Sequence, residues 1–184
     1  MSKAVIFFAQ GLEECEGLLC VDILRRAGVE VTVAAVGGER VVRSARQVNV
    51  VADALAEELD YSGFDAVILP GGLPGVDHLK ADATVRRTCC DFAAAGKLVA
   101  AICAAPTLLS KLGITEGKRC VCYPGLEHEM GSAKMEDAAT VQDGRLLTGR
   151  GPGAAIDFGL MLLKVLRGEQ AAQQVQTGMV YHNA

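Results

Sequence analysis

Residues 98–107 read LVAAICAAPT and indicate the fold more clearly than any other stretch of the chain. The first five, Leu98 to Ile102, are an apolar run typical of a buried strand, and Pro106 suits the first turn of a following helix. Small alanines flank Cys103 where the strand must turn into that helix. This pattern is typical of a nucleophile elbow, which turns sharply and leaves its reactive side chain accessible.

Strands and helices alternate on both sides of this elbow. We expect further strands at 4–8, 29–36, 66–69 and 146–148, and helices near 13–27, 82–95, 104–112 and 153–167. Near-continuous apolar strands separated by helices predict a doubly wound α/β sandwich with a mostly parallel sheet. Hairpin-like insertions are expected at 36–41 and 141–146, the second with an Asp-Gly turn.

Composition excludes several classes of protein. The 184 residues suit one domain spanning 1–184, and 51% hydrophobic against 22% charged residues exclude disorder. The net charge of −4, without a long basic run, predicts no nucleic-acid partner. No apolar stretch is long enough for a signal peptide or a membrane span, so we expect a soluble cytoplasmic protein.

The cysteines and histidines predict no metal site. The seven cysteines contain no Cys-x-x-Cys pair, and the three histidines lack the spacing of zinc ligands.

An acidic segment, QGLEECE at residues 10–16, opens the first predicted helix. Cys20, Ile23 and Leu24 follow Glu16 by four, seven and eight positions, which puts Glu16 on the helix face that packs on the sheet. Such an inward carboxyl has a raised pKa and is protonated at pH 7. The alternative is that first-turn acids only complement the helix dipole, and we favour it for Glu13 and Glu14.

Glycines follow two other predicted strands. Gly71 and Gly72 leave backbone amides uncovered, as an oxyanion or anion site requires, although such a turn is more often only a turn. Residues 148–153, TGRGPG, suggest close packing near the same crevice. A phosphate-cradling loop is a weak alternative there, because the Walker lysine is absent.

The cysteines divide into one candidate nucleophile and six others. Cys103 precedes a helix N-terminus, which should depress its pKa and favour the thiolate. We expect the other six to be small, buried and apolar.

Together, EECE at 13–16, LPGG at 69–72, AAICAAP at 100–106 and RGPG at 150–153 resemble the ThiJ/PfpI superfamily, most closely its branch of DJ-one and bacterial YajL proteins. The resemblance spans nearly the whole chain. It implies a flavodoxin-like sandwich of the class I glutamine amidotransferase-like type, a homodimer, no cofactor and a reactive elbow cysteine.

The resemblance also implies roles for individual residues. Cys103 matches the nucleophilic, oxidation-sensitive cysteine, and Glu16 matches the protonated glutamate that hydrogen-bonds to it. The amides of Gly72 and Ala104 match the oxyanion-hole positions, and Gly71 supports them.

Arg26 and Arg46 match arginines near the active site and the dimer interface in this branch, although a solvated surface charge is as good an interpretation of each.

The chain departs from the superfamily pattern in two places. Ala104 stands where peptidase members carry a histidine, so a Cys-His peptidase mechanism lacks its base. Tyr123 and Pro124 stand where the DJ-one branch has a histidine before a proline. Glu16 must then carry the proton transfers, and His128 could substitute in part.

Three functions are compatible with these residues. The resemblance implies a glyoxalase or deglycase that needs no cofactor and acts on a small dicarbonyl such as methylglyoxal or on a glycated adduct, protecting against oxidative stress. The main alternative is a redox sensor or stress-response chaperone in which Cys103 is oxidised to a sulfinate held by Glu16. An amidase or acyl-transfer enzyme is a third, for which a histidine motif is missing.

Overall fold

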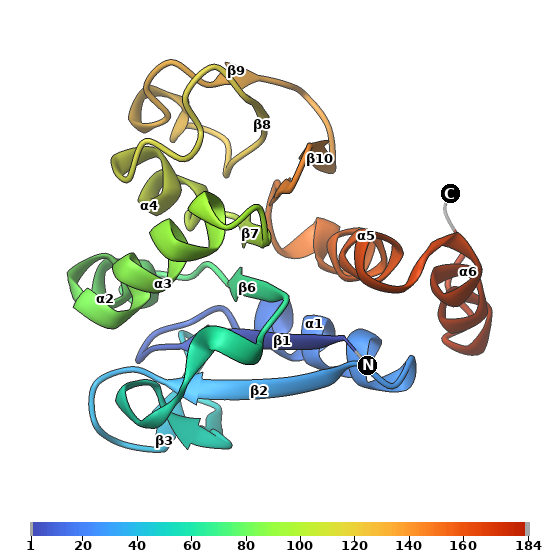
Figure 1. The fold of residues 1–184 in the computed structure, drawn as a ribbon, viewed down its shortest axis with the longest axis horizontal. Coiled ribbons are helices and arrows are strands. Elements are labelled where there is room, and N and C mark those ends of the chain that lie inside the picture. The colour runs from blue at the N-terminus through green and yellow to red at the C-terminus, as the bar shows by residue number, and fades with distance from the viewer. Residues whose placement is uncertain (1, 183–184) are drawn as a thin grey trace.

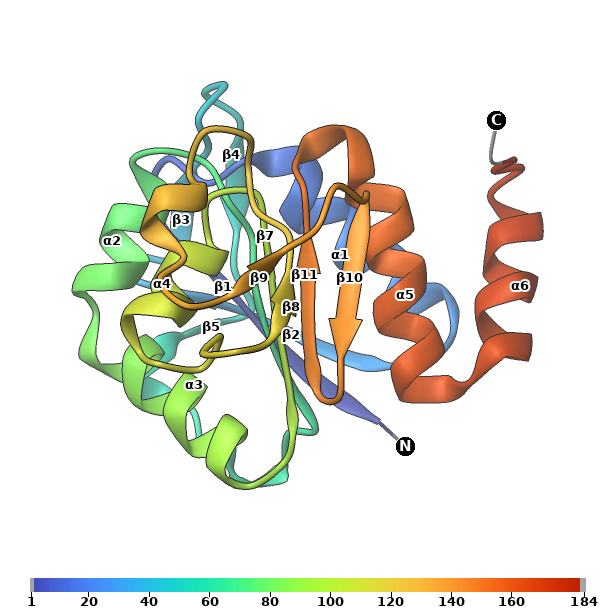
Figure 2. The same cartoon turned by 90° about the horizontal axis from the view of Figure 1, so that it is seen from above.

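Wholly apolar runs form the middle of the sheet in the computed structural model, which describes residues 2–182. Residues of β6 (Ala66–Leu69) and β7 (Leu98–Ile102) are all buried, as are those of β1 (Lys3–Phe8) after Lys3. Strands buried on both faces need a layer of helices on each side. Figure 2 shows α2, α3 and α4 on one side and α1 and α5 on the other, with α6 outermost against α5.

Among the described residues, the main sheet has seven strands in the order β10-β11-β7-β6-β1-β2-β5. Figure 1 labels β10, β7, β6, β1 and β2 of this series. Pairing is parallel throughout except between β10 and β11 at one edge. This confirms the predicted doubly wound, mostly parallel sheet. The remaining members are β2 (Glu30–Ala35), β5 (Ala54–Leu55), β10 (Thr140–Asp143) and β11 (Leu146–Gly149).

The helices agree with four predicted segments and add two more. The predicted ones are α1 (Glu14–Arg26), α3 (Ala83–Ala94), α4 (Pro106–Lys111) and α5 (Ala155–Arg167). The sequence analysis missed α2 (Gly75–Ala81) and α6 (Glu169–Gly178). The apolar signal of α6 is weak because only Ala172 and Val175 are buried in it. None of the helices in the described part of the chain is long and apolar enough to cross a membrane.

One of the two predicted hairpins was misplaced. Residues 36–40 only connect β2 to a separate hairpin of β3 (Val41–Arg43) and β4 (Asn49–Val51). β2 cannot pair with β3, because its two sides are already occupied by β1 and β5. The second prediction is confirmed: β10 and β11 form a hairpin whose turn contains Gly144 at φ +63°, within the main sheet. A short pair, β8 (Arg119–Cys120) and β9 (Lys134–Met135), lies apart from that sheet.

The carboxyl ends of the parallel strands meet at one edge of the sheet, where α1, α2 and α4 follow β1, β6 and β7. The β3–β4 hairpin reaches the same edge, since the Gly11 amide donates to the Arg43 carbonyl at 2.7 Å and the Ala45 amide donates to the Leu12 carbonyl at 2.8 Å. This is the edge at which ligand sites of doubly wound folds lie.

Candidate active site

Cys103 occupies a sharp turn between β7 and α4. Its φ is +65°, a left-handed conformation uncommon outside glycine. Both of its backbone groups are hydrogen-bonded: the amide donates to the Gly149 carbonyl at 2.9 Å, and the carbonyl accepts from the Tyr123 amide at 2.8 Å. The geometry is that of the predicted nucleophile elbow, with the cysteine 8% exposed.

Glu16 points inward from α1, as its spacing predicted, and is fully buried. Its Oε2 accepts a hydrogen bond from the Gly71 amide at 2.7 Å. Oε1 is buried without a nitrogen or oxygen partner among the described residues. Burial raises the pKa of Glu16 to about 7, against the opposing effects of the Gly71 amide and of a hydrogen bond with Cys103.

The two glycines after β6 bring the site together. A Cβ on Gly71 would lie 2.5 Å from Cys103 Cβ, 2.7 Å from Glu16 Oε2 and 3.0 Å from Cys103 Sγ. Gly72 adopts φ +92°, and a Cβ there would lie 2.3 Å from the backbone nitrogen of Glu13. Only residues without side chains allow the strand, the helix and the elbow to approach so closely.

The proton of the Cys103 thiol is held more tightly than the sequence suggested. The pKa of Cys103 is raised to about 12, chiefly by burial and further by the Glu16 carboxylate, against the lowering effect of the amides of Gly72 and Ala104. The expected depression by a helix N-terminus was therefore wrong, because desolvation and a neighbouring negative charge outweigh it. When the proton moves from sulfur to Glu16, the opposing charge disappears and the two amides remain to stabilise the thiolate.

Tyr123 approaches the elbow through its backbone, by the hydrogen bond to the Cys103 carbonyl, and the residue is 47% exposed. His128 lies in a separate exposed 3-10 turn, where its Nδ1 is 3.0 Å from the Gly125 carbonyl oxygen.

The two arginines lie differently. Arg26 is in the last turn of α1, about 15 Å along the helix from Glu16, and its Nε lies 2.7 Å from Asp22 Oδ2. The structure thus does not bring Arg26 to Cys103. Arg46 is exposed in the turn of the β3–β4 hairpin, next to Ala45. That hairpin adjoins the loop before α1, through the hydrogen bond from the Ala45 amide to the Leu12 carbonyl.

Two of the other cysteines differ from expectation. All seven thiols are free, but Cys15 in α1 and Cys90 in α3 are exposed. The helix faces that carry them point to solvent, whereas Cys20 and Cys89 occupy the buried faces of the same helices. Within residues 2–182, no group of three or more His, Cys, Asp or Glu side chains is arranged to hold a metal ion.

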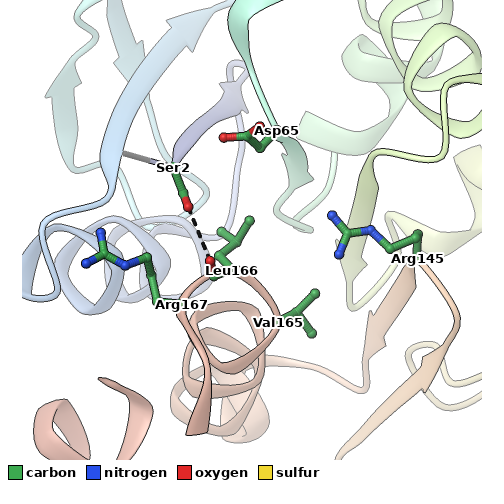
Figure 3. A pocket seen from close by; sticks show the side chains of 6 residues that line it. All are labelled: Ser2, Asp65, Arg145, Val165, Leu166 and Arg167. Carbon is green, nitrogen blue, oxygen red and sulfur yellow. Dashed lines mark hydrogen bonds between the residues drawn. The ribbon is translucent and has the colours of Figure 1, made fainter. Parts of the chain in front are cut away.

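Two cavities lie at opposite ends of the sheet. One of about 390 Å³ is lined by Tyr123, Pro124, Arg150 and Gly151, among others, beside the elbow. The sequence analysis did not predict this cavity, although it predicted that residues 148–153 pack near the same crevice. A larger one of about 840 Å³, shown in Figure 3, is lined by Asp65 and other residues at the amino ends of the strands. It lies away from the carboxyl-end site.

Known proteins match the chain over nearly its whole length. A family model described as the DJ-1/PfpI family matches residues 2–165. The chain is 38% identical over 183 residues to Protein dj-1beta of Drosophila melanogaster, covering 98% of each chain. It is 30% identical over 171 residues to the glutathione-independent glyoxalase DJR-1.2 of Caenorhabditis elegans, covering 92% of this chain and 90% of that one. The structure of oxidized Toxoplasma gondii DJ-1 superimposes with a TM-score of 0.96 at 32% identity over 100% of both chains. The elbow and buried glutamate predicted from sequence, and the agreement with these proteins in sequence and fold, show that the chain belongs to the DJ-1/PfpI family.

Proposed function

We propose that this protein is a cofactor-independent glyoxalase that converts a small α-oxoaldehyde such as methylglyoxal to the corresponding α-hydroxy acid. The observation that carries the proposal is the buried pair of Glu16 and Cys103, in which a carboxyl with a pKa near 7 adjoins a thiol at an elbow. A general base with a pKa near the working pH is the most efficient one. The relative named as a glutathione-independent glyoxalase supports the same activity.

The reaction starts with formation of a carbon–sulfur bond. The Glu16 carboxylate takes the thiol proton of Cys103, and the thiolate attacks the aldehyde carbon. The carbonyl electron pair moves to oxygen, where the amides of Gly72 and Ala104 stabilise the alkoxide. Glu16 then returns its proton to that oxygen, which leaves a hemithioacetal on Cys103 and a carboxylate ready to act again.

The second stage moves hydrogen between adjacent carbons. Glu16 removes the proton from the former aldehyde carbon to give an enediol, a proton passes between the two oxygens, and Glu16 delivers its proton to the neighbouring carbon. The product is a thioester of lactate, with one carbon oxidised and the other reduced. Water attacks the thioester, the carbon–sulfur bond breaks, and the thiolate recovers a proton, so methylglyoxal and water give lactic acid without an external oxidant.

The test follows methylglyoxal loss and lactate appearance with a chelator present and with a phosphine in place of a thiol reductant. We expect lactate from the wild type, loss of activity in Cys103→Ser and Glu16→Gln, and full activity in Cys90→Ser, which changes an exposed thiol in α3. No lactate above buffer from freshly reduced wild type would exclude the glyoxalase. Assaying an early glyoxal adduct of a peptide in the same series extends the test to a deglycase.

A second candidate function is redox sensing, which is favoured by the free, oxidisable cysteines and by the oxidized state in which the Toxoplasma gondii relative is described. One hydrogen peroxide oxidises the Cys103 thiolate to a sulfenate with release of water, and a second gives the sulfinate, which the protonated Glu16 and the two amides can hold. Free thiols of this number suit the reducing cytosol. The test is peroxide titration with mass spectrometry: we expect two added oxygens on Cys103, and none in Cys103→Ser.

We also propose that the chain forms a homodimer through the β3–β4 hairpin. Val41 and Val51 are a directly opposed cross-strand pair, 47% and 71% exposed. Two large apolar side chains on a two-stranded hairpin form a surface that association would bury, and self-association of such a patch is most often two-fold.

A further inference from the structure

The cavity of about 390 Å³ lies beside the elbow and is lined by residues 123–124, 139 and 150–154. One of its walls is formed by Tyr123, whose amide donates to the Cys103 carbonyl at 2.8 Å. The other begins at Arg150, which follows Gly149, and the Gly149 carbonyl accepts from the Cys103 amide at 2.9 Å. The two segments that enclose the cavity are therefore each hydrogen-bonded to the backbone of Cys103.

The cavity walls are apolar and closely apposed. A Cβ on Gly151 would lie only 3.3 Å from Cδ2 of the Tyr123 ring, so glycine at this position lets the loop rest against the ring. Pro124 and Pro152 line the same cavity and restrict the backbone on each side. A cavity with mostly apolar walls and an oriented polar group is typical of a small-molecule subsite.

Arg150 supplies that polar group. Among the lining residues that the structure describes, it alone carries a charge. Its backbone is held by a hydrogen bond from its amide to the Ala139 carbonyl at 3.0 Å. Its guanidinium pairs with Asp137, a side chain that is 88% exposed. Such an exposed partner contributes little and gives way readily to a carboxylate or phosphate that binds both arms of the guanidinium.

We infer that this cavity is the substrate subsite and that Arg150 binds an anionic group there, so that the preferred substrate is an α-oxoaldehyde bearing a carboxylate or a phosphate. The inference rests on the proposed glyoxalase function and names its substrate class. The aldehyde end reacts at Cys103, and the anionic end lies in the cavity against Arg150. Arg150 is thus a specificity-determining residue that takes no part in the proton transfers.

Arg145 is a matched control. It lies before the opposite end of β11, is exposed, and lines the cavity of about 840 Å³ at the amino ends of the strands (Figure 3). Arg145→Ala therefore makes the same change in net charge as Arg150→Ala on the same hairpin.

The kinetic test compares three substrates: methylglyoxal, dioxovalerate with its terminal carboxylate, and hydroxypyruvaldehyde phosphate. For Arg150→Ala we expect KM for the two anions to rise roughly 10- to 100-fold, the effect of losing hydrogen bonds to a charged group, and KM for methylglyoxal, which has no anionic group, to rise much less. Arg150→Lys should keep part of the preference for the anions, because it keeps the positive charge. Asp137→Asn should lower KM for the anions, and Arg145→Ala should leave all constants unchanged. A preference for only one anion identifies the group recognised.

If Arg150→Ala loses activity equally on methylglyoxal and on the anions, Arg150 has a structural role and the inference is overturned. Unchanged KM values for the anions would overturn it as well. A calorimetric measurement of the binding of hydroxyglutarate and of lactate separates this inference from the proposed function. Hydroxyglutarate binding that weakens in Arg150→Ala while the wild type forms no lactate supports the subsite and contradicts the glyoxalase. If the wild type forms lactate but binds hydroxyglutarate and lactate equally well, the glyoxalase is supported and the subsite is contradicted.

Discussion

The amide of Gly71 donates a 2.7 Å hydrogen bond to Glu16 Oε2 across 55 positions of sequence, joining the loop after β6 to α1. That bond orients the carboxyl toward the elbow and favours its ionised form, yet burial prevails and the pKa of Glu16 rises to about 7. The site therefore contains a base whose strength is set by two opposing interactions of known origin, and both can be altered separately.

The pH dependence of stability should report on Glu16. Its pKa rises from 4.5 to about 7 on folding, so below pH 4.5 the carboxyl is protonated in both states. Between pH 4.5 and 7 the unfolded chain ionises first, and the folded state loses about 3 kcal/mol relative to it, at ~1.4 kcal/mol per pKa unit. Urea unfolding across this range should show Glu16→Gln gaining stability over wild type as pH rises and levelling off above pH 7.

Other acids also titrate in this range, so the difference between wild type and Glu16→Gln is the quantity to measure. A difference that is flat with pH, or that grows toward acid, contradicts the raised pKa.

Gly71→Ala should damage the site without removing a chemical group. Its new Cβ would meet Cys103 Cβ at 2.5 Å, so the elbow or α1 must shift, and we expect loss of most activity and about 1–3 kcal/mol of stability. Gly63→Ala is the control, because a Cβ there meets nothing within 4 Å. Thermal unfolding and the lactate assay measure both effects. Wild-type activity in Gly71→Ala would show that the close approach is unnecessary.

Removing the charge of Glu16 should make Cys103 more acidic. The carboxylate raises the pKa of Cys103, whereas the amides of Gly72 and Ala104 lower it, so Glu16→Gln leaves the lowering contributions in place. Alkylation rates of Cys103 against pH, followed by mass spectrometry at that residue, should show a lower midpoint in the variant. An unchanged or higher midpoint means that burial alone sets the thiol pKa.

The phenol of Tyr123 should be dispensable for methylglyoxal turnover. Its contact with the elbow is made by the backbone amide, which any residue other than proline retains. Tyr123→Phe should therefore keep kcat close to that of wild type. A fall of ~10²–10⁴, which is what a lost acid–base group costs, would identify the phenol as the replacement for the family histidine.

Val51→Lys should prevent dimer formation. The side chain is 71% exposed beside Val41, and a lysine there would have to be desolvated in an interface. Sedimentation should show a dimer for wild type and a monomer for the variant, with Val180→Lys, an equally exposed valine near the C-terminus, as the control. A monomeric wild type, or a dimeric Val51→Lys protein, argues against this hairpin as the interface.

The sequence alone was sufficient for the elbow, the inward carboxyl and the strands of the main sheet other than the two-residue edge strand β5, which it did not predict. Apolar runs such as 66–69 and 98–102 are local signals that only a doubly covered strand satisfies, and the spacing of Glu16 from Cys20 and Leu24 is a property of one helix. The small residues around Cys103 likewise report a local turn. These features depend on neighbours in the chain, which is why periodicity and residue type suffice to predict them.

Long-range packing determined the rest. The meeting of Gly71 with Glu16 and Cys103 depends on three segments converging at one edge of the sheet, and no local pattern encodes their distances. The raised pKa of Cys103 arises from burial beside Glu16, and the cavity of Arg150 arises from two loops bonded to opposite sides of the elbow. Desolvation and close contact are properties of assembled surfaces, so they exist only once the chain has folded.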